Sequence, residues 1–144
     1  MVLADLDHFK RINDTYGHLA GDAVLKEAAL RMKSGVRPYD TVGRYGGEEF
    51  LLVVPSSDAG GTNTVAERVR QSLEAAPIRT DAGQVWVTAS LGVAISTEAE
   101  PIEPEEILRQ ADEALYRAKS RGRNRVELFE RSSIHASTPN EPGR

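Results

Sequence analysis

The segment TVGRYGGEEFLLVV, residues 41–54, places a glycine pair and two adjacent carboxylates between two apolar stretches. Residues 41–45 and 50–54 have the β-branched and aromatic content of strands, and residues 46–49 separate them as a turn. A plain two-residue hairpin favours Asn-Gly or Asp-Gly, whereas an acidic pair adds repulsion without helping the chain to fold. The segment therefore predicts a β-hairpin whose turn has a purpose beyond folding.

The turn residues Gly46, Gly47, Glu48 and Glu49 suit a phosphorylated ligand and a cation. Glycines allow a ligand to approach the backbone closely. Mg²⁺ is typically bound by one or two carboxylates together with substrate phosphates. A solvated acidic turn is the alternative, because Gly-Gly-acidic strings are short and common. The turn alone leaves both interpretations open.

A second acidic pair, Asp5 and Asp7, follows the first apolar run, where residues 1–6 indicate a buried strand. Both carboxylates lie on one side if the strand continues, whereas Asp7 caps the next helix if the chain turns after Leu6. We favour the second geometry and expect Asp5 alone to bind a metal. A strand-end Asp that meets a hairpin carboxylate is typical of nucleotidyl-transfer metal sites.

The rest of the chain shows alternating helical and strand patterns and no internal repeat. Helices are expected over residues 9–16, 22–33, 65–76 and 103–121, and further strands over residues 85–95 and 126–129. Residues 131–144 are polar and are expected to be a disordered tail or linker. This order predicts one domain, residues 1–130, of the α/β (α+β) class, with a mixed central sheet, flanking helices and a ferredoxin-like core.

Composition excludes several classes of protein. The 144 residues include no Cys, which rules out disulfide scaffolds and thiolate zinc sites. No apolar run approaches the roughly 18 residues of a membrane span, and the N-terminus lacks the layout of a signal peptide. We therefore expect a soluble, cytoplasmic domain, although a longer parent protein can be membrane-attached.

Five cations alternate near the end of the chain, at Arg117, Lys119, Arg121, Arg123 and Arg125. Basic residues stabilise the last turn of a helix, so a solvated run is one interpretation. A triphosphate clamp is another, since Lys supplies a mobile charge and Arg a planar fork. Nucleic-acid binding is a third, disfavoured by the net charge of -4 and by the lack of interleaved exposed aromatics. We expect no nucleic-acid partner.

Taken together, these residues resemble the GGDEF-domain family, the bacterial diguanylate cyclases, in its GGEEF variant. The resemblance runs from about Val2 to Phe129. Its pieces are Asp5-x-Asp7-x-Phe9-Lys10-x-x-Asn13-Asp14, Gly17-His18-x-x-Gly21-Asp22-x-x-Leu25, Arg44-Tyr45-Gly46-Gly47-Glu48-Glu49-Phe50, Thr88-x-Ser90-x-Gly92-x-Ala94, and Asp112-x-Ala114-Leu115-Tyr116-x-Ala118-Lys119 with Gly122-Arg123-Asn124. Each piece alone is weak, but their shared order and intervals are specific.

The resemblance implies a nucleotide-cyclase-palm-like fold that condenses two GTP molecules into cyclic di-GMP and two pyrophosphates. By that analogy Mg²⁺, or Mn²⁺ in its place, is bound by Asp5, the backbone carbonyl of Leu6, Glu48 and Glu49. Glu48 and Glu49 are also the candidate catalytic residues, because either can help to deprotonate the 3′-hydroxyl. The sequence does not divide these roles between the two glutamates.

The resemblance also implies the GTP-binding residues. Asn13, His18 and Asp22 match positions that recognise guanine and ribose, and Asp22 matters most for the choice of base. Phosphate-binding positions are matched by the backbone amides of Phe9 and Lys10, by Gly46 and Gly47, and by the side chains of Lys119 and Arg123.

Further implied properties are a homodimer, feedback control and a partner domain. Each family domain holds one GTP, so two copies must face one another for catalysis. Arg37 and Asp40 form an Arg-x-x-Asp pattern at the family's product-inhibition position, with Arg68 as a second contact for cyclic di-GMP. A sensor or receiver domain is expected N-terminal in the full protein.

The sequence departs from the family pattern at its start. Family domains usually carry a segment such as Asp-x-Leu-Thr-Gly-Leu-x-Asn-Arg and a helix before the first strand, and this sequence begins at that strand. We therefore expect an N-terminally truncated domain. The alternative to an active cyclase is a catalytically silent module that binds GTP or cyclic di-GMP.

Overall fold

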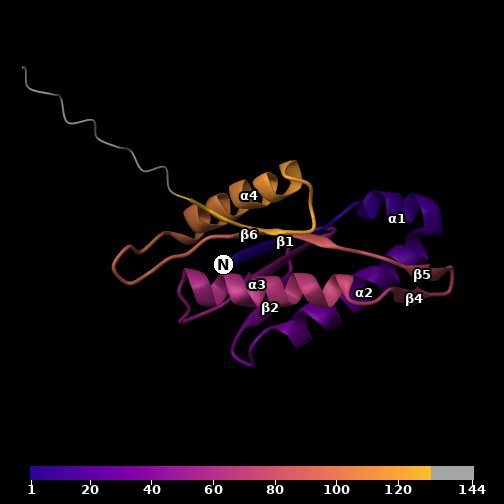
Figure 1. Ribbon diagram of the computed structural model, residues 1–144, viewed down its shortest axis with the longest axis horizontal. Coiled ribbons are helices and arrows are strands. Elements are labelled where there is room, and N and C mark those ends of the chain that lie inside the picture. The colour runs from indigo at the N-terminus through magenta and orange to yellow at the C-terminus, as the bar shows by residue number, and fades with distance from the viewer. Residues whose placement is uncertain (131–144) are drawn as a thin grey trace, which may run out of the picture.

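The computed structural model describes residues 1–130, and the tail expected at residues 131–144 lies outside the described residues. The elements, in chain order, are β1 Val2–Leu6, α1 Phe9–Tyr16, α2 His18–Gly35, β2 Thr41–Arg44, β3 Glu49–Val53, α3 Ala59–Glu74, β4 Ile78–Thr80, β5 Gly83–Val85, β6 Ala89–Val93, α4 Pro104–Ser120 and β7 Val126–Leu128. Figure 1 shows the sheet running through the middle of the molecule, with helices on both sides.

The main sheet has five strands in the order β2-β3-β1-β6-β7. Its central strand β1 pairs antiparallel with both β3 and β6, and β2 pairs antiparallel with β3. Only β7 runs parallel to its neighbour, β6. The predicted mixed sheet with flanking helices is therefore confirmed, and its middle strand carries Asp5.

The two faces of the sheet pack against different helices. Val2, Ala4 and Leu6 of β1 point into the larger core, which also contains the apolar faces of α2 and α3. Leu3 points the other way and packs in a second core with Ile107, Ala111 and Leu115 of α4. Since side chains alternate along a strand, Asp5 shares the α4 face with Leu3.

Close approach between the sheet and α4 depends on Gly92 in β6. A Cβ on Gly92 would overlap the backbone carbonyl of Ala111 and the backbone nitrogen of Leu115. The absent side chain lets the α4 backbone lie directly on the sheet, which brings the C-terminal end of α4 to the end of β1.

Several sequence-based boundaries differ in the structure. Helix α3, expected over residues 65–76, begins at Ala59, because the Asp58 carboxylate caps it by accepting a hydrogen bond from the Gly61 N–H, and it ends at Glu74. The helix expected from Asp22 begins earlier, at His18, because Gly17 turns the chain sharply at φ 90° between α1 and α2. The strand expected over residues 85–95 is divided into β5 and β6. A hairpin of β4 and β5, unpredicted from the sequence, is held by Thr80, whose hydroxyl bonds the Gly83 carbonyl oxygen across the turn.

The predicted hairpin strands are confirmed within one residue at each end, and residues 45–48 form the turn between them. Among residues 1–130, no helix has both the length and the apolar character needed to cross a membrane.

Candidate active site

An acidic cluster forms where β1 and β3 end beside the hairpin turn. The strand register places Asp5 directly opposite Glu49, so the two side chains lie on the same face of the sheet. Glu48 is joined to the same point through its backbone carbonyl, which accepts a hydrogen bond of 3.2 Å from the Leu6 N–H. The structure thus brings Asp5, Glu48 and Glu49 together, as the sequence predicted.

One lysine from α4 balances this cluster. The Nζ atom of Lys119 donates a hydrogen bond of 3.0 Å to Oδ2 of Asp5, whose side chain is only 7% exposed. Lys119 is itself about one-third exposed, and its charged end therefore lies between the buried carboxylate and solvent. The pair joins the end of β1 to the end of α4.

The electrostatics of the cluster raise the pKa of both glutamates. Burial raises the pKa of Glu48 most, and the negative charge of Asp5 and a hydrogen bond with it add to the effect, whereas Lys119 opposes it. Burial also raises the pKa of Glu49, followed by the charge of Asp5. Without a bound cation the cluster carries more negative charge than its surroundings favour.

The turn itself is held by its backbone and by Arg44. The N–H groups of Tyr45 and Gly46 donate to the Glu49 carbonyl oxygen at 2.8 and 3.2 Å. The Arg44 guanidinium donates to the carbonyl oxygens of Gly46 and Gly47 at 3.1 and 2.7 Å. Arg44 therefore fixes the turn from outside the cluster.

Neither turn glycine adopts a positive φ, so left-handed backbone does not explain their presence. A Cβ on Gly46 would lie 3.1 Å from Oε2 of Glu49, which is a tight approach. A Cβ on Gly47 would meet nothing within 4 Å. The glycine at position 47 therefore leaves bare backbone beside the carboxylates.

The donor set at this cluster fits a hard divalent cation. Asp5 and Glu48 supply carboxylate oxygens in contact with one another, and the Leu6 carbonyl lies at the same strand end. Within residues 1–130 there is no group of three or more His, Cys, Asp or Glu side chains arranged to hold a metal ion. Since Mg²⁺ usually takes one or two carboxylates and completes its shell with phosphates and water, a pair of carboxylates is compatible with it.

Asp7 does not cap α1, and that expectation is wrong. The N-cap position of α1 is His8, at φ 55°, and no side chain caps this helix. The Asp7 carboxylate instead accepts hydrogen bonds of 2.7 Å from the hydroxyls of Thr88 and Ser90 and one of 3.0 Å from the Asn124 N–H. The chain does turn after Leu6, where β1 ends, but Asp7 contacts Ser90, which pairs with Asp5 in the sheet, so Asp5 and Asp7 still lie on the same side.

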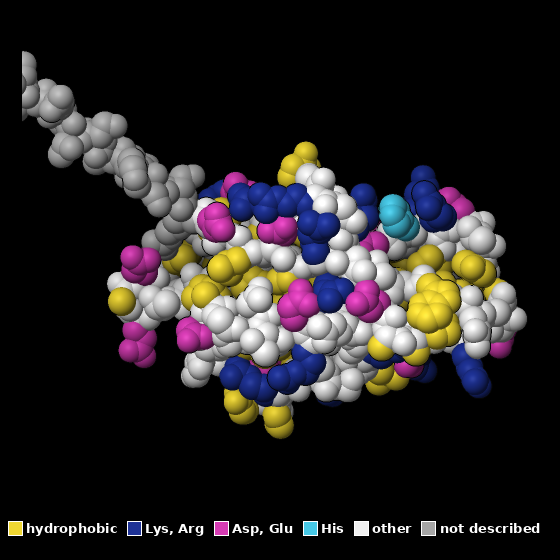
Figure 2. All heavy atoms as spheres, viewed as in Figure 1, with side chains coloured by type: hydrophobic (Ala, Val, Ile, Leu, Met, Phe, Trp, Pro, Cys, Tyr) yellow, Lys and Arg dark blue, Asp and Glu magenta, His cyan; other side chains and the backbone are white. Residues whose placement is uncertain are grey.

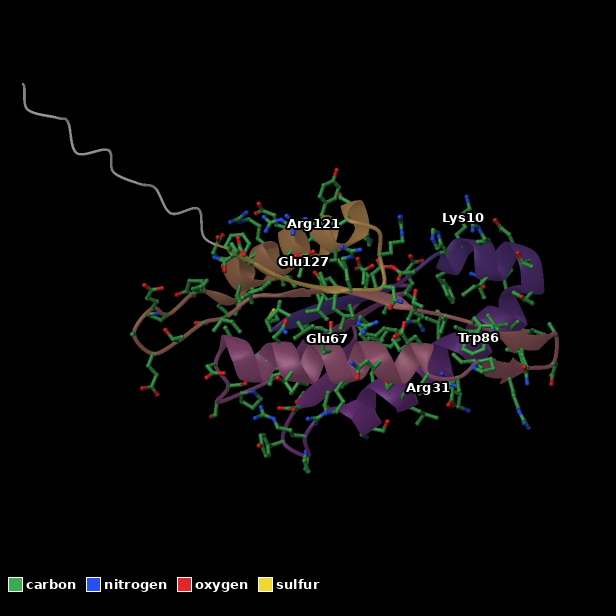
Figure 3. The ribbon with its side chains drawn as sticks, viewed as in Figure 1. Lys10, Arg31, Glu67, Trp86, Arg121 and Glu127 are labelled. Atoms are coloured by element: carbon green, nitrogen blue, oxygen red, sulfur yellow. The ribbon has the colours of Figure 1, made fainter. Side chains whose placement is uncertain are left out.

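The predicted phosphate-binding amides of Phe9 and Lys10 lie in the first turn of α1. This turn follows β1 directly, so its N–H groups lie near the acidic cluster in the chain. Phe9 is buried and anchors the helix in the larger core, whereas the Lys10 side chain is exposed and projects from α1 in Figure 3.

The predicted base-recognition residues lie where α1 meets α2. A Cβ on Gly21 would overlap the amide oxygen of Asn13, so this glycine makes room for that side chain. Asp22 is the next residue and borders a groove of about 400 Å³ between α2 and β2, lined also by Leu25 and Phe50. His18 is exposed at the first residue of α2 and does not line this groove.

The alternating cations have different environments. Figure 2 shows Lys and Arg side chains gathered over α4, with acidic side chains beside them. Arg121 forms an ion pair of 3.0 Å with Glu127, and Figure 3 labels the two residues close together, one above the other. Lys119 faces Asp5, and Arg123 is exposed just beyond the helix. The run is thus divided between a surface ion pair at Arg121, a lysine that contacts the acidic cluster, and an exposed arginine beyond the helix.

The predicted product-inhibition residues form a separate group after α2. The Arg37 guanidinium donates to both carboxylate oxygens of Asp40, at 3.0 and 2.9 Å, and lies 4.5 Å from the centre of the Tyr39 ring. Hydrogen bonding to Arg37 lowers the pKa of Asp40, and the charge of Arg68 acts in the same direction. Arg68 therefore approaches this group from α3.

Sequence reasoning did not identify Arg44, Asn124, Thr88 or Ser90 as parts of the site. Arg44 stands directly before the turn, and its long side chain can reach the carbonyl groups of the glycines that follow it. This position could have been read from the sequence. The other three residues belong to the quoted motifs but were given no role, because their contacts with Asp7 span 81 to 117 positions.

Comparison with known proteins assigns the family. The family model described as diguanylate cyclase, GGDEF domain, matches residues 1–125. The chain therefore belongs to the GGDEF-domain family. Diguanylate cyclase A of Treponema denticola is 46% identical over 128 residues, which make up 89% of this chain and 34% of that protein. The chain spans about a third of the length of the curated relatives that it matches.

Solved structures agree with this assignment. The GGDEF domain of DgcB from Caulobacter crescentus, in complex with c-di-GMP, has a TM-score of 0.82 and 33% identity, covering 90% of this chain and 77% of that one. The active GGEEF domain of a diguanylate cyclase from Vibrio cholerae has a TM-score of 0.81 and 33% identity, covering 91% and 82%. At these identities the fold and the family are shared.

Proposed function

We propose that this domain is a diguanylate cyclase that condenses two GTP molecules into cyclic di-GMP. The observation that carries the proposal is the contact between the Asp5 and Glu48 carboxylates beside the bare Gly46-Gly47 backbone, with Lys119 facing them. These groups combine oxygen donors for a cation, room for phosphates and a cation that can bind them. The relative described as an active GGEEF domain has the same turn sequence as this chain.

The reaction forms two phosphodiester bonds. In each half, the 3′-hydroxyl oxygen of one GTP bonds to the α-phosphorus of the other, and the bond from that phosphorus to pyrophosphate breaks. The hydroxyl proton passes to a carboxylate, for which Glu48 and Glu49 are the candidates. Two such steps release two pyrophosphates and close the ring.

Asp5, Glu48, Glu49 and the Leu6 carbonyl are the proposed ligands of Mg²⁺, or of Mn²⁺. When bound, the ion would neutralise charge on the phosphates and lower the pKa of the attacking hydroxyl. The protein groups fix where the triphosphate lies. The α1 N-terminal amides of Phe9 and Lys10, the Gly46-Gly47 backbone, and the side chains of Lys119 and Arg123 are proposed to bind it.

Guanine is proposed to bind at the junction of α1 and α2. An Asp22 carboxylate can accept hydrogen bonds from the N1 and N2 hydrogens of guanine, and adenine offers no such pair. The side-chain amide of Asn13, which lies beside Gly21, can donate a hydrogen bond to an acceptor on the edge of guanine. His18 is the proposed polar contact at the ribose side, and its exposure leaves it accessible.

Catalysis by this mechanism requires a homodimer. One domain positions one GTP, so each 3′-hydroxyl must reach an α-phosphate held by a second copy. Because the substrate is a cytosolic nucleotide, we place the domain in the cytoplasm. In the longer protein, a sensor or receiver domain N-terminal to this segment would control the encounter of the two copies.

Feedback inhibition by cyclic di-GMP is proposed at Arg37, Asp40 and Arg68. The Arg37–Asp40 pair already holds its guanidinium in a fixed orientation, and a planar guanidinium suits phosphate and guanine acceptors. Arg68 adds a second positive charge from α3. The c-di-GMP complex of DgcB supports the assignment of this ligand class to the family fold.

The direct test is turnover. The purified chain is incubated with GTP and Mg²⁺ at several protein concentrations, and the nucleotides are separated by chromatography. We expect cyclic di-GMP to form with more than first-order dependence on protein, and Glu48→Ala to abolish it, while Glu98→Ala, a change in an exposed loop, is the matched control. GTP left intact at every concentration, or full turnover by Glu48→Ala, would overturn the proposal.

A further inference from the structure

The segment immediately after α4 has an unusual backbone. Gly122, Arg123 and Asn124 have φ angles of 118°, 64° and 45°, so three consecutive residues lie in the left-handed region. Residues with a Cβ rarely adopt this conformation and do so where the surrounding structure enforces it. One constraint on this segment is the Arg123 N–H, which donates a hydrogen bond of 3.0 Å to the Ala118 carbonyl oxygen.

Asn124 supplies the remaining constraints on this segment. Its side-chain amide donates to Oε2 of Glu74 at 2.6 Å, and its side-chain carbonyl accepts from Nη1 of Arg70 at 2.9 Å. Both partners are on α3, and they are also paired with each other at 3.1 Å. Both ends of the Asn124 side chain are therefore held by a rigid helix.

The backbone of Asn124 is held by a different element. Its N–H donates to Oδ2 of Asp7, which is 6% exposed and is itself fixed by the hydroxyls of Thr88 and Ser90. Asp7 lies two residues after Asp5 and two before Phe9. The Asn124 hydrogen bonds thus join α3 to the β1–α1 connection at the residue next to Arg123, and Asp7 links this point to Ser90 of β6.

We propose that Asn124 is a positioning residue that sets the place of Arg123 relative to the acidic cluster. This inference rests on the proposed function, in which Arg123 binds the triphosphate. Arg123 is exposed and has no side-chain partner among the hydrogen bonds described for residues 1–130. Its position is therefore set by its backbone, and Asn124 holds that backbone in the left-handed conformation.

The test separates positioning from general stability. Asn124→Gly retains access to the left-handed backbone and removes the side-chain hydrogen bonds to α3. Binding of 3′-deoxy-GTP and 3′-deoxy-GMP, neither of which can condense, is measured by calorimetry with Mg²⁺. We expect roughly tenfold weaker binding of the triphosphate and a change within about twofold for the monophosphate. Equal losses for both nucleotides, or no loss for either, would overturn the inference.

Glu67→Gln is the matched control, since it removes a different partner of Arg70 on the same helix and leaves both Asn124 contacts in place. It should bind both nucleotides as the wild type does. Should Asn124→Gly lower the yield of folded protein, Glu74→Ala removes the acceptor of the Asn124 amide from outside the segment. That variant is expected to show the same triphosphate-specific loss.

A double-variant cycle tests whether Asn124 acts through Arg123. If it does, Arg123→Ala combined with Asn124→Gly should bind 3′-deoxy-GTP no more weakly than Arg123→Ala alone. Fully additive losses would contradict the inference. If Arg123→Ala alone leaves triphosphate binding unchanged, the phosphate assignment in the proposed function fails, which is a separate outcome from failure of the Asn124 role.

Discussion

Lys119 and Asp5 form an ion pair of 3.0 Å although they are 114 positions apart in the chain. The pair ties α4 to the central strand β1 and gives a buried carboxylate its nearest positive charge. Asp5 also has Glu48 and Glu49 as charged neighbours, so the lysine offsets three negative groups. This arrangement makes a stability prediction that does not depend on any ligand.

Lys119→Met should lower the free energy of unfolding by about 1 to 2 kcal/mol at pH 7, because it leaves the Asp5 carboxylate buried beside Glu48 without its counter-charge. Partial exposure of Lys119 keeps the effect below that of a fully buried pair. Urea unfolding in EDTA measures it. Arg117→Met on the same helix is the control and should change stability by less than about 0.5 kcal/mol. Equal effects of the two substitutions would contradict the prediction.

The raised pKa of Glu48 predicts that the free energy of unfolding depends on pH. Its pKa is raised in the folded state above the ordinary 4.5, so the folded protein holds this proton more tightly than the unfolded chain. The associated stability is fully present below 4.5 and is lost as the pH rises through the raised pKa. In metal-free protein, Glu48→Gln should therefore be more stable than the wild type at pH 7, with a difference that shrinks toward pH 4.5. Unfolding by urea across this range checks it, and a difference that grows on acidification would refute it.

Gly92→Ala should destabilise the domain strongly. Its methyl group would overlap the α4 backbone at Ala111 and Leu115, and two backbones cannot separate without disturbing the second core. We expect a loss of about 3 kcal/mol, at the upper end for overpacking. Thermal or urea unfolding measures it, with Gly43→Ala as a control, since a Cβ there meets nothing within 4 Å. A loss below 1 kcal/mol, with Gly43→Ala unchanged, would show that α4 lies farther from the sheet.

Gly47→Ala should separate folding from function. Its φ is not positive and its Cβ would project into open space, so the free energy of unfolding should change by less than about 0.5 kcal/mol. If nucleotide phosphates approach this backbone, cyclic di-GMP formation should fall by about tenfold or more, because small displacements of reacting groups are costly. Chromatographic turnover and urea unfolding of the same preparation give both numbers. Wild-type turnover would show that phosphates do not lie against residue 47.

The acidic cluster could be predicted because its signals are local. Glu48 and Glu49 follow a glycine pair in a hairpin, and Asp5 ends an apolar run, so each residue is marked by its neighbours. The apolar face of α4 could likewise be predicted, from the spacing of Ile107, Ala111 and Leu115.

The role of Asp7 could not be predicted in the same way. A carboxylate directly before a helix has the ordinary signature of an N-cap. Its actual partners, Thr88, Ser90 and Asn124, are distant in sequence, and three hydrogen-bond donors to one buried carboxylate outweigh a single capping bond. The β4–β5 hairpin escaped prediction because three-residue strands are too short for an alternation pattern to emerge.

The span between Asp5 and Lys119 also bears on when the site comes into existence. At the usual rate of roughly 5 to 20 residues per second, a ribosome needs on the order of ten seconds to make the 114 residues that separate them. For most of that interval, once residue 49 has been added, the nascent chain contains the glycine turn and its carboxylates but neither Lys119 nor Asn124, which holds Asp7. Closing such a distant contact belongs to the late stage of folding, since its loop must be ordered first. The ion pair and the Asp7 contact of the site therefore form only after nearly the whole domain has been synthesised.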